Sequence, residues 1–145
     1  MTEQNWFGAN EETNEARDII ITFDGGAIPN PGLGYGSFNI REKGQDWFIF
    51  KKSREEYGDN LTSNQAEYMA LISACKNAKK MIGTSLNLKI IGDSMLVLKQ
   101  ATGEWKVKKE KLKDLNKELK RLLISFNSFN VEHRTRENSV REFGH

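Results

Sequence analysis

Three acidic residues that are far apart in the sequence each stand where an apolar segment meets a polar break. They are Asp24 in ITFDGG, Glu67 in NQAEYMAL and Asp93 in KIIGDSML. Carboxylates that a fold brings together repel one another, which raises their pKa values. Mg²⁺ and Mn²⁺ favour carboxylate and water ligands, so an ion of this kind would stabilise the group. Two ions shared between the acids would form a site for phosphodiester hydrolysis.

Each acid also has a purely structural explanation, which the sequence leaves open. Asp24 before two glycines is typical of a turn. Asn64 as N-cap with Glu67 three residues later fits a capping box at the start of a helix. Asp93 or Ser94, between a strand and a helix, fits an ordinary N-cap. The catalytic explanation differs from these because it requires all three acids to meet in space.

The segments around the acids alternate between strand and helix character. A β-branched run at 18–24 and the segments 36–43 and 46–53 predict three strands in an antiparallel meander, with a turn at Lys43–Gly44 and a loop at 58–64. From Asn64, alanines recur every four residues, at Ala66, Ala70, Ala74 and Ala78. This spacing predicts a helix whose small-residue face lies close to a sheet.

The rest of the sequence predicts a strand, two helices and a last strand, at 86–93, 94–102, 111–126 and 129–135. The order βββ-α-β-α-α-β indicates an α/β fold with a mixed five-stranded sheet and helices packed on it. A chain of 145 residues has the size of one domain. We expect residues 1–17 to be a disordered extension and residues 18–145 to form the domain.

Composition sets broad limits on partners and location. The net charge of +2 is compatible with a nucleic-acid partner but does not require one. The single cysteine, Cys75, excludes an internal disulfide and favours a reducing, cytoplasmic location. The sequence has neither a secretory signal nor a run of about 20 apolar residues, so we expect no membrane association. We also expect a monomer.

A basic segment, GEWKVKKEKLK, follows the second predicted helix. Its Trp105, Lys106, Lys108, Lys109 and Lys111 combine an aromatic ring with positive charge, which suits contact with a nucleic-acid backbone. The alternative is a solvated helix face with the tryptophan in the core.

Several of these motifs resemble those of type 1 ribonuclease H. FDGGAIPNPGLGYG, TSNQAEYMAL and GDSMLVLKQATGEWKVK occur in the family's order, and the likeness covers residues 19 to about 138. The archaeal and bacterial variants with Asp-Gly-Gly and Asn-Pro-Gly are the most similar. The resemblance implies a ribonuclease H-like fold and an endonuclease that cleaves the RNA strand of RNA–DNA hybrids with two divalent ions, normally Mg²⁺. The products would carry 3′-hydroxyl and 5′-phosphate ends, and the catalytic, metal-binding acids would be Asp24, Glu67 and Asp93.

The resemblance also implies residues that contact the substrate. Backbone groups near the first acid and before the glutamate would recognise the 2′-hydroxyl that distinguishes RNA from DNA, here at Gly25, Gly26, Asn64 and Gln65. Glycines suit this role because they permit close approach. A plain tight turn is the alternative explanation for the glycine pair.

The sequence departs from the family pattern after the last strand. Aligning Asn138 with the family's asparagine places Glu142 at the fourth acid, which is usually Asp, whereas an ungapped match through Arg136–Glu137 places Phe143 there. We take Glu142 as the fourth catalytic and metal-binding acid, with Asn138 as a neutral alternative ligand. The final helix is expected to be truncated.

Some family members use a loop histidine as a proton shuttle. We expect His133 to be structural and His145 to be free, and we assign no histidine a catalytic role. Arg134 or Arg136 better matches the arginine that replaces the histidine in a related branch.

Two other functions stay open. One is a non-catalytic ribonuclease H-like module that binds a hybrid or a protein partner, which the unusual C-terminal segment favours. The other is a 3′–5′ exonuclease of related fold, which normally has Asp-x-Glu in its first strand where this chain has Asp24-Gly-Gly26.

Overall fold

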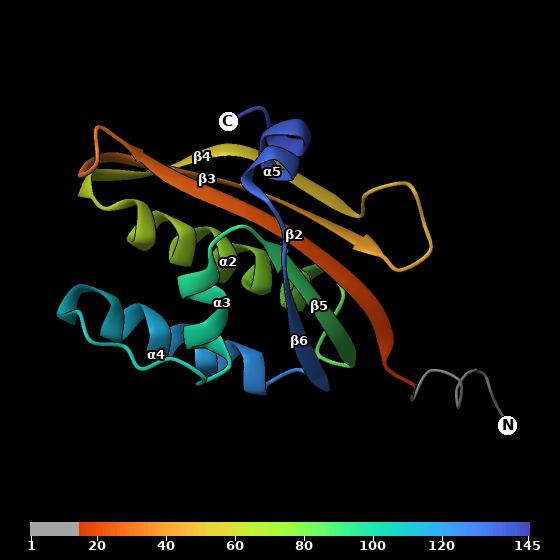
Figure 1. Cartoon of the computed structure of the whole chain (residues 1–145). Coiled ribbons are helices and arrows are strands. Elements are labelled where there is room, and N and C mark those ends of the chain that lie inside the picture. The colour runs from red at the N-terminus through yellow and green to blue at the C-terminus, as the bar shows by residue number, and fades with distance from the viewer. Residues whose placement is uncertain (1–14) are drawn as a thin grey trace, which may run out of the picture.

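The computed structural model of the chain describes residues 15–145 (Figure 1). The extension expected at residues 1–17 therefore lies almost entirely outside the described residues, and Arg17 already belongs to the first strand. The described part forms one mixed sheet of five strands in the order β4-β3-β2-β5-β6. The predicted succession of strands and helices is confirmed, and a further short helix follows the last strand.

The antiparallel half of the sheet consists of β2 (Arg17–Ile28), β3 (Gly32–Glu42) and β4 (Phe50–Leu61). The predicted turn at Lys43–Gly44 is present. Several predicted strand ends were wrong, since β3 begins four residues earlier than expected, at Gly32, and β4 four residues later, at Phe50. β2 does not stop at Asp24 but continues through both glycines, and β4 runs on through the expected loop to Leu61. The second extension is possible because Gly58 and Asn60 adopt positive φ values that suit irregular pairing along an edge strand.

β2 lies at the centre of the sheet, where the antiparallel and the parallel halves meet. β5 (Leu86–Gly92) runs parallel to β2, and β6 (Ser128–His133) runs parallel to β5. β2 is therefore hydrogen-bonded on both sides, by β3 and by β5. The parallel crossovers are made by helices, as this connection requires.

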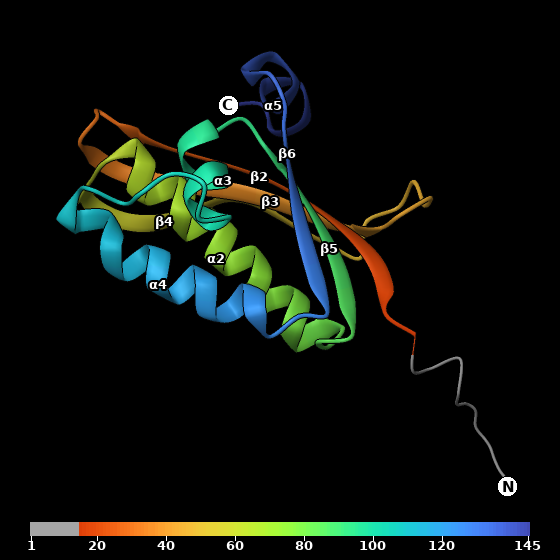
Figure 2. The same cartoon turned by 60° about the horizontal axis from the view of Figure 1, so that its bottom comes forward.

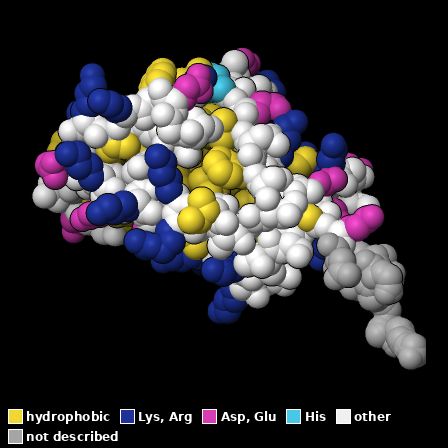
Figure 3. Space-filling view, turned by 90° about the horizontal axis from the view of Figure 1, so that it is seen from below, with side chains coloured by type: hydrophobic (Ala, Val, Ile, Leu, Met, Phe, Trp, Pro, Cys, Tyr) yellow, Lys and Arg dark blue, Asp and Glu magenta, His cyan; other side chains and the backbone are white. Residues whose placement is uncertain are grey.

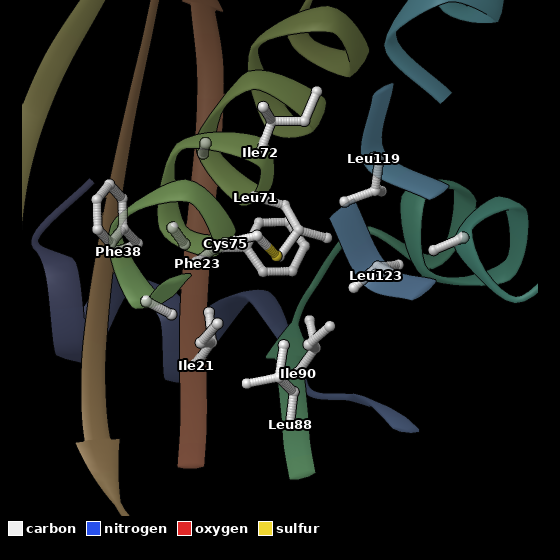
Figure 4. Packing of buried hydrophobic residues seen from close by; sticks show 14 of the residues in the cluster. Ile21, Phe23, Phe38, Leu71, Ile72, Cys75, Leu88, Ile90, Leu119 and Leu123 are labelled. Carbon is white, nitrogen blue, oxygen red and sulfur yellow. The ribbon is translucent and has the colours of Figure 1, made fainter. Parts of the chain in front are cut away.

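Three helices cover one face of the sheet, as Figures 1 and 2 show. They are α2 (Ser63–Met81), α3 (Met95–Ala101) and α4 (Glu110–Ile124). The four predicted alanines of α2 are fully buried, so this helix lies close to β2 and β3. In Figure 4, Phe23 of β2, Leu71 of α2 and Leu119 of α4 contribute to one continuous core.

Of the residues that the structure describes, the opposite face carries one short helix, α5 (Arg136–Phe143), which lies across β2 (Figures 1 and 2). Thr135 caps its start, and Gly144 ends it in a left-handed conformation with φ of 81°. The helix has eight residues, and its truncation relative to the family stays a prediction. Within residues 15–145, each helix is too short or too polar to cross a membrane.

Candidate active site

Asp24 lies inside the central strand, and its turn-forming explanation is wrong. It pairs with Ser37 of β3, four residues before β2 ends, and it is 1% exposed. Thr22 and Asp24 share one face of the strand because side chains alternate along it. That face is covered by α5, since Thr22 hydrogen-bonds to Glu142 of this helix. A carboxylate is thus buried in a sheet with no turn to form.

Glu67 is not part of the cap of its helix. The N-cap of α2 is Thr62, whose hydroxyl accepts the Gln65 backbone N–H at 3.2 Å, while the Gln65 side-chain oxygen accepts the Thr62 N–H at 2.9 Å. The capping box expected from Asn64 and Glu67 therefore forms two residues earlier. Glu67 has no capping role, whereas Gln65, which we expected at the substrate, uses its side-chain oxygen in the cap.

Asp93 is likewise not a helix cap. It follows the last residue of β5, and the next residue, Ser94, caps α3 by accepting the Val97 N–H at 3.3 Å. None of the three acids therefore has the structural role that the sequence allowed. Thr62 and Ser94 cap the two helices, and Asp24 lies within a strand that is longer than expected.

Gly25 explains how Glu67 comes so close to Asp24. A Cβ atom on Gly25 would lie 2.7 Å from the Ala66 carbonyl oxygen and 2.8 Å from the Glu67 Cα. The first turns of α2 rest directly on the β2 backbone because no side chain separates them. At Gly26 a Cβ would meet the Tyr35 hydroxyl at 2.8 Å. Both glycines serve close packing inside a strand, so the tight-turn explanation was wrong.

The three acids converge at one point of the fold. Oxygen atoms of Asp24, Glu67 and Asp93 all lie within 4.8 Å of one another. Asp24 Oδ1 and Asp93 Oδ2 are buried and lack a hydrogen-bond partner within the described residues. Buried carboxylate oxygens without donors are costly, and a cation would satisfy them. The donor set therefore fits a divalent ion that prefers oxygen ligands.

The electrostatics of the cluster agree with this assignment. Burial raises the pKa of Asp24 to about 7, with a further contribution from the Asp93 charge. Burial also raises the pKa of Glu67 to about 8, although hydrogen bonding from Ser94 opposes the shift. Arg136 lies 3.7 Å from Asp93 and partly compensates the negative charge. A divalent ion would compensate it further.

Glu142 lies outside this cluster. Its carboxylate accepts hydrogen bonds from Thr22 at 2.6 Å, from Arg134 at 2.6 Å and from Asn39. Burial opposes ionisation of this group, but these three hydrogen bonds outweigh it and lower the pKa of Glu142. Its oxygens are thus already occupied, and its role as a metal ligand stays a prediction.

The alternative ligand, Asn138, is also engaged elsewhere. Its side-chain amide donates to the Thr135 hydroxyl at 3.1 Å, and its oxygen accepts from Arg141 at 2.7 Å. Of the two arginines considered, Arg134 holds Glu142, whereas Arg136 faces the acid cluster.

His145 is the residue that sequence reasoning missed. We expected it to be free, but its side chain is 7% exposed and its Nδ1 lies 3.3 Å from Asp24 Oδ2. Its Nε2 lies 2.6 Å from the Ser37 hydroxyl. The signal in the sequence was Gly144, which can end a helix and turn the chain back. His133, by contrast, is exposed at the end of β6.

The predicted basic segment borders a cavity of about 580 Å³ beside the first turn of α2. Trp105 is 45% exposed, so it does not belong to the core. Figure 3 shows Lys and Arg side chains flanking hydrophobic surface on this helical face. The cavity is lined by Asn64, Leu96, Gln100, Glu104, Trp105, Lys106, Lys108, Lys109 and Leu112. Asn64 lies three residues, about one helical turn, before Glu67, and Asp24, Glu67 and Asp93 do not line the cavity.

Comparison with known proteins identifies the family. Residues 23–141 match the family model described as reverse transcriptase-like. A solved structure of LC11-RNase H1 in complex with an RNA/DNA hybrid is 30% identical, covers 86% of this chain and 92% of its own, and superposes with a TM-score of 0.76. The chain belongs to the type 1 ribonuclease H family. The fold and the family that the motifs implied are thereby confirmed.

Other members of the ribonuclease H family are similar to a like degree. The N-terminal RNase H domain of Rv2228c from Mycobacterium tuberculosis has a TM-score of 0.79 at 28% identity, over 87% of this chain and 88% of that one. RNase H1 from the archaeon Halobacterium salinarum has a TM-score of 0.77 at 29% identity, over 86% and 90%.

Curated relatives of this ribonuclease H chain are longer than the chain itself. The bifunctional protein Rv2228c of Mycobacterium tuberculosis is 33% identical over 79% of this chain, which spans 30% of that protein. Ribonuclease HI of Halobacterium salinarum is 32% identical over 82% of this chain, which spans 57% of it.

Proposed function

We propose that this protein is a metal-dependent endoribonuclease that hydrolyses the RNA strand of RNA–DNA hybrids and leaves 3′-hydroxyl and 5′-phosphate ends. The observation that carries the proposal is the convergence of Asp24, Glu67 and Asp93 within 4.8 Å, from three separate elements. No structural role accounts for these acids. A family member with 30% identity was solved in complex with an RNA/DNA hybrid, which supports the choice of substrate.

The acid cluster would hold two divalent ions, Mg²⁺ or Mn²⁺, when substrate is bound. Such ions activate a water molecule for attack and stabilise charge on the phosphate and on the leaving 3′-oxygen. Asp24, Glu67 and Asp93 would hold these ions. The rigid central strand and the first turns of α2 keep the carboxylates in place. Arg136 would limit the excess negative charge where the phosphate must approach.

Residues next to the acids would hold the hybrid. Gly26 and Asn64, the latter at the start of α2, are partly exposed and would offer backbone groups to the RNA 2′-hydroxyl, whereas Gly25 is buried against α2 and its contact with the substrate stays a prediction. Trp105, Lys106 and Lys108 line the cavity and would contact the backbone of the hybrid by stacking and by charge.

A cytoplasmic location and a monomeric state are part of the same proposal. Cys75 is fully buried, and burial raises the pKa of its thiol to about 12, so the thiol is unreactive. An inert, unpaired cysteine suits a reducing compartment.

The test of the function compares end-labelled RNA–DNA, RNA–RNA and DNA–DNA duplexes, each with Mg²⁺, with Mn²⁺ and with EDTA. We expect cleavage of the RNA in the hybrid alone and only with metal. Asp24→Asn should reduce cleavage by at least about 100-fold, because it removes a charged ligand. The matched control is Asp18→Asn, since Asp18 lies on the same strand, is exposed and is absent from the cluster.

The outcomes separate the alternatives. Hybrid binding without cleavage by the wild-type protein would support the non-catalytic module. Degradation from a 3′ end would support the exonuclease. Cleavage that Asp24→Asn leaves intact in a folded protein would contradict the assignment of the acid cluster.

A further inference from the structure

The chain turns back after α5 and brings an imidazole ring to the acid cluster. Gly144 ends the helix in its left-handed conformation, and the next residue, His145, returns to the sheet. Its ring packs edge-on against Tyr35, with 5.0 Å between centroids, and stacks against Phe143 at 6.1 Å. These contacts bury the ring and fix its position beside Asp24.

The two ring nitrogens of His145 have different environments. Nε2 lies 2.6 Å from the hydroxyl oxygen of Ser37, which also accepts the Arg54 backbone N–H at 2.9 Å. A hydroxyl oxygen has two lone pairs, so it can accept from Nε2–H as well. With the proton on Nε2, the other nitrogen, Nδ1, presents a free lone pair.

The Nδ1 atom lies beside the acid cluster. Nδ1 lies 3.3 Å from Asp24 Oδ2, yet it is buried and lacks a hydrogen-bond partner among residues 15–145. Ligands at right angles around an ion with bonds of about 2.1 Å lie about 3.0 Å apart. The observed separation is close to this value. A histidine that binds a metal also normally donates its second N–H to an acceptor, which is the position of Ser37 here.

We propose that His145 Nδ1 is a metal ligand, which shares with Asp24 one of the divalent ions of the site. This inference rests on the proposed function and adds to it a nitrogen donor. His145 would take the place that we expected Glu142 to fill, since the Glu142 carboxylate is occupied by Thr22, Asn39 and Arg134.

A nitrogen ligand has a chemical consequence that an acid would not have. Mg²⁺ favours oxygen ligands, whereas Mn²⁺ and later transition metals bind imidazole nitrogen more readily. The site should therefore favour Mn²⁺ over Mg²⁺ more than a site of carboxylates alone. A side chain that merely packs beside Asp24 would not change this preference.

The decisive measurement is pulsed electron paramagnetic resonance of Mn²⁺ bound to the protein without a polyhistidine tag. A nitrogen bonded to Mn²⁺ gives a ¹⁴N coupling, which becomes a ¹⁵N coupling when the histidines are ¹⁵N-labelled. The sequence has two histidines. We expect the coupling in the wild-type protein and in His133→Gln, and its loss in His145→Gln. No histidine coupling in the wild-type protein would overturn the proposal without the need for any variant.

Calorimetric titration of Mn²⁺ and Mg²⁺ supplies a second readout. His145→Gln keeps a polar group for Ser37 but should weaken Mn²⁺ binding by roughly tenfold or more. His145→Asp places an oxygen as many bonds from Cα as Nδ1 is. It should therefore shift the preference toward Mg²⁺. Thermal unfolding of each variant verifies that the fold is intact.

The possible results distinguish this inference from the proposed function. Mn²⁺ binding that depends on Asp24 but is unchanged in His145→Gln would reduce His145 to a packing role. Tighter binding and faster cleavage in His145→Gln would show that the ring obstructs the site, which also contradicts ligation. No ion binding by the wild-type protein would instead refute the metal site itself.

Discussion

The carboxyl groups of Asp24 and Glu67 should release protons when the site binds a metal ion. Burial raises their pKa values to about 7 and about 8, so the ion-free protein holds protons on them near neutral pH. A divalent ion binds the ionised form and therefore releases these protons. The charge of these buried carboxyl groups therefore depends on whether they bind protons or a metal ion.

The ion-free protein should lose stability as pH rises from about 6.5 to about 8.5. Both folded pKa values lie above the ordinary values near 4, so in this range the native state binds more protons than the unfolded state. Their stabilising contribution is complete below about pH 4 and is lost as pH passes 7 and 8. Urea unfolding in EDTA would measure it, and Glu67→Gln should flatten the slope.

Two other groups, His145 and Glu142, make stability rise with pH, but they do so below the pH range of this measurement. Burial and nearby arginines lower the pKa of His145, which adds stability with rising pH only up to about 6.5. The lowered pKa of Glu142 acts below about pH 4.5. A flat or rising stability above pH 6.5 would contradict the assignment of raised pKa values to the cluster.

The sequence predicted the acids but not the residues around them. Apolar runs followed by a polar break indicated Asp24 and Asp93, although β2 continues past Asp24 to Ile28. Helix caps could not be assigned, because Thr62, Ser63 and Asn64 are all capable N-caps and only the geometry selects one. Gly144 indicated where a helix could end, but His145 was missed because its contact with Asp24 depends on tertiary packing.

At the scale of elements, the packing of α2 on β2 sets the distance between two of the acids. The strand order and the helix faces followed from periodicity, since alanines every four residues fit a helix close to a sheet. The length of β2 did not follow, because two glycines read as a turn. They are instead the place where the helix touches the strand.

Gly25→Ala should impair cleavage more than its effect on stability suggests. The new methyl group would meet backbone atoms of Ala66 and Glu67 at 2.7–2.8 Å, so α2 must move away from β2. Overpacking of this kind costs about 1–3 kcal/mol. The shift would also carry Glu67 away from Asp24. Cleavage rate and urea unfolding, measured on the same protein, would show both effects.

Gly44→Ala is the control for this prediction. Gly44 has φ of 87° and open space around its Cβ position, so alanine there introduces backbone strain without a clash. The cost is about 1–2 kcal/mol. Because the β3–β4 turn does not contact the acid cluster, cleavage should be preserved. Equal losses of activity in the two variants would show that instability alone explains the effect of Gly25→Ala.

At the scale of the whole molecule, the distribution of charge matters more than its total. A net charge of +2 gives little long-range attraction for nucleic acid. We therefore expect local attraction for the hybrid to come from the lysines that line the cavity.

Changing Lys106 and Lys108 to alanine should weaken hybrid binding and reduce its dependence on salt. Each lost phosphate contact lowers the slope of log affinity against log salt by about 0.9. The control is the pair Lys79 and Lys80, which is exposed in the last turn of α2, at the end away from the cavity. Binding titrations at several salt concentrations would measure both pairs. Equal slopes for both variants would remove the cavity lysines from the hybrid interface.

Both candidates for a fourth ligand depend on α5, because Glu142 belongs to this helix and His145 follows it. Their presence at the acid cluster therefore depends on the fraction of molecules in which α5 is docked. Residues 19–22 of β2 are paired on both sides, so we expect their backbone amides to exchange with solvent only when the sheet opens. Because an eight-residue helix is not stable alone, we expect α5 to open locally more often than the sheet does. Such an opening removes His145 and Glu142 and leaves the other three acids in place. The apparent affinity for an ion that needs His145 is then its intrinsic affinity reduced by the fraction of molecules in which α5 is docked.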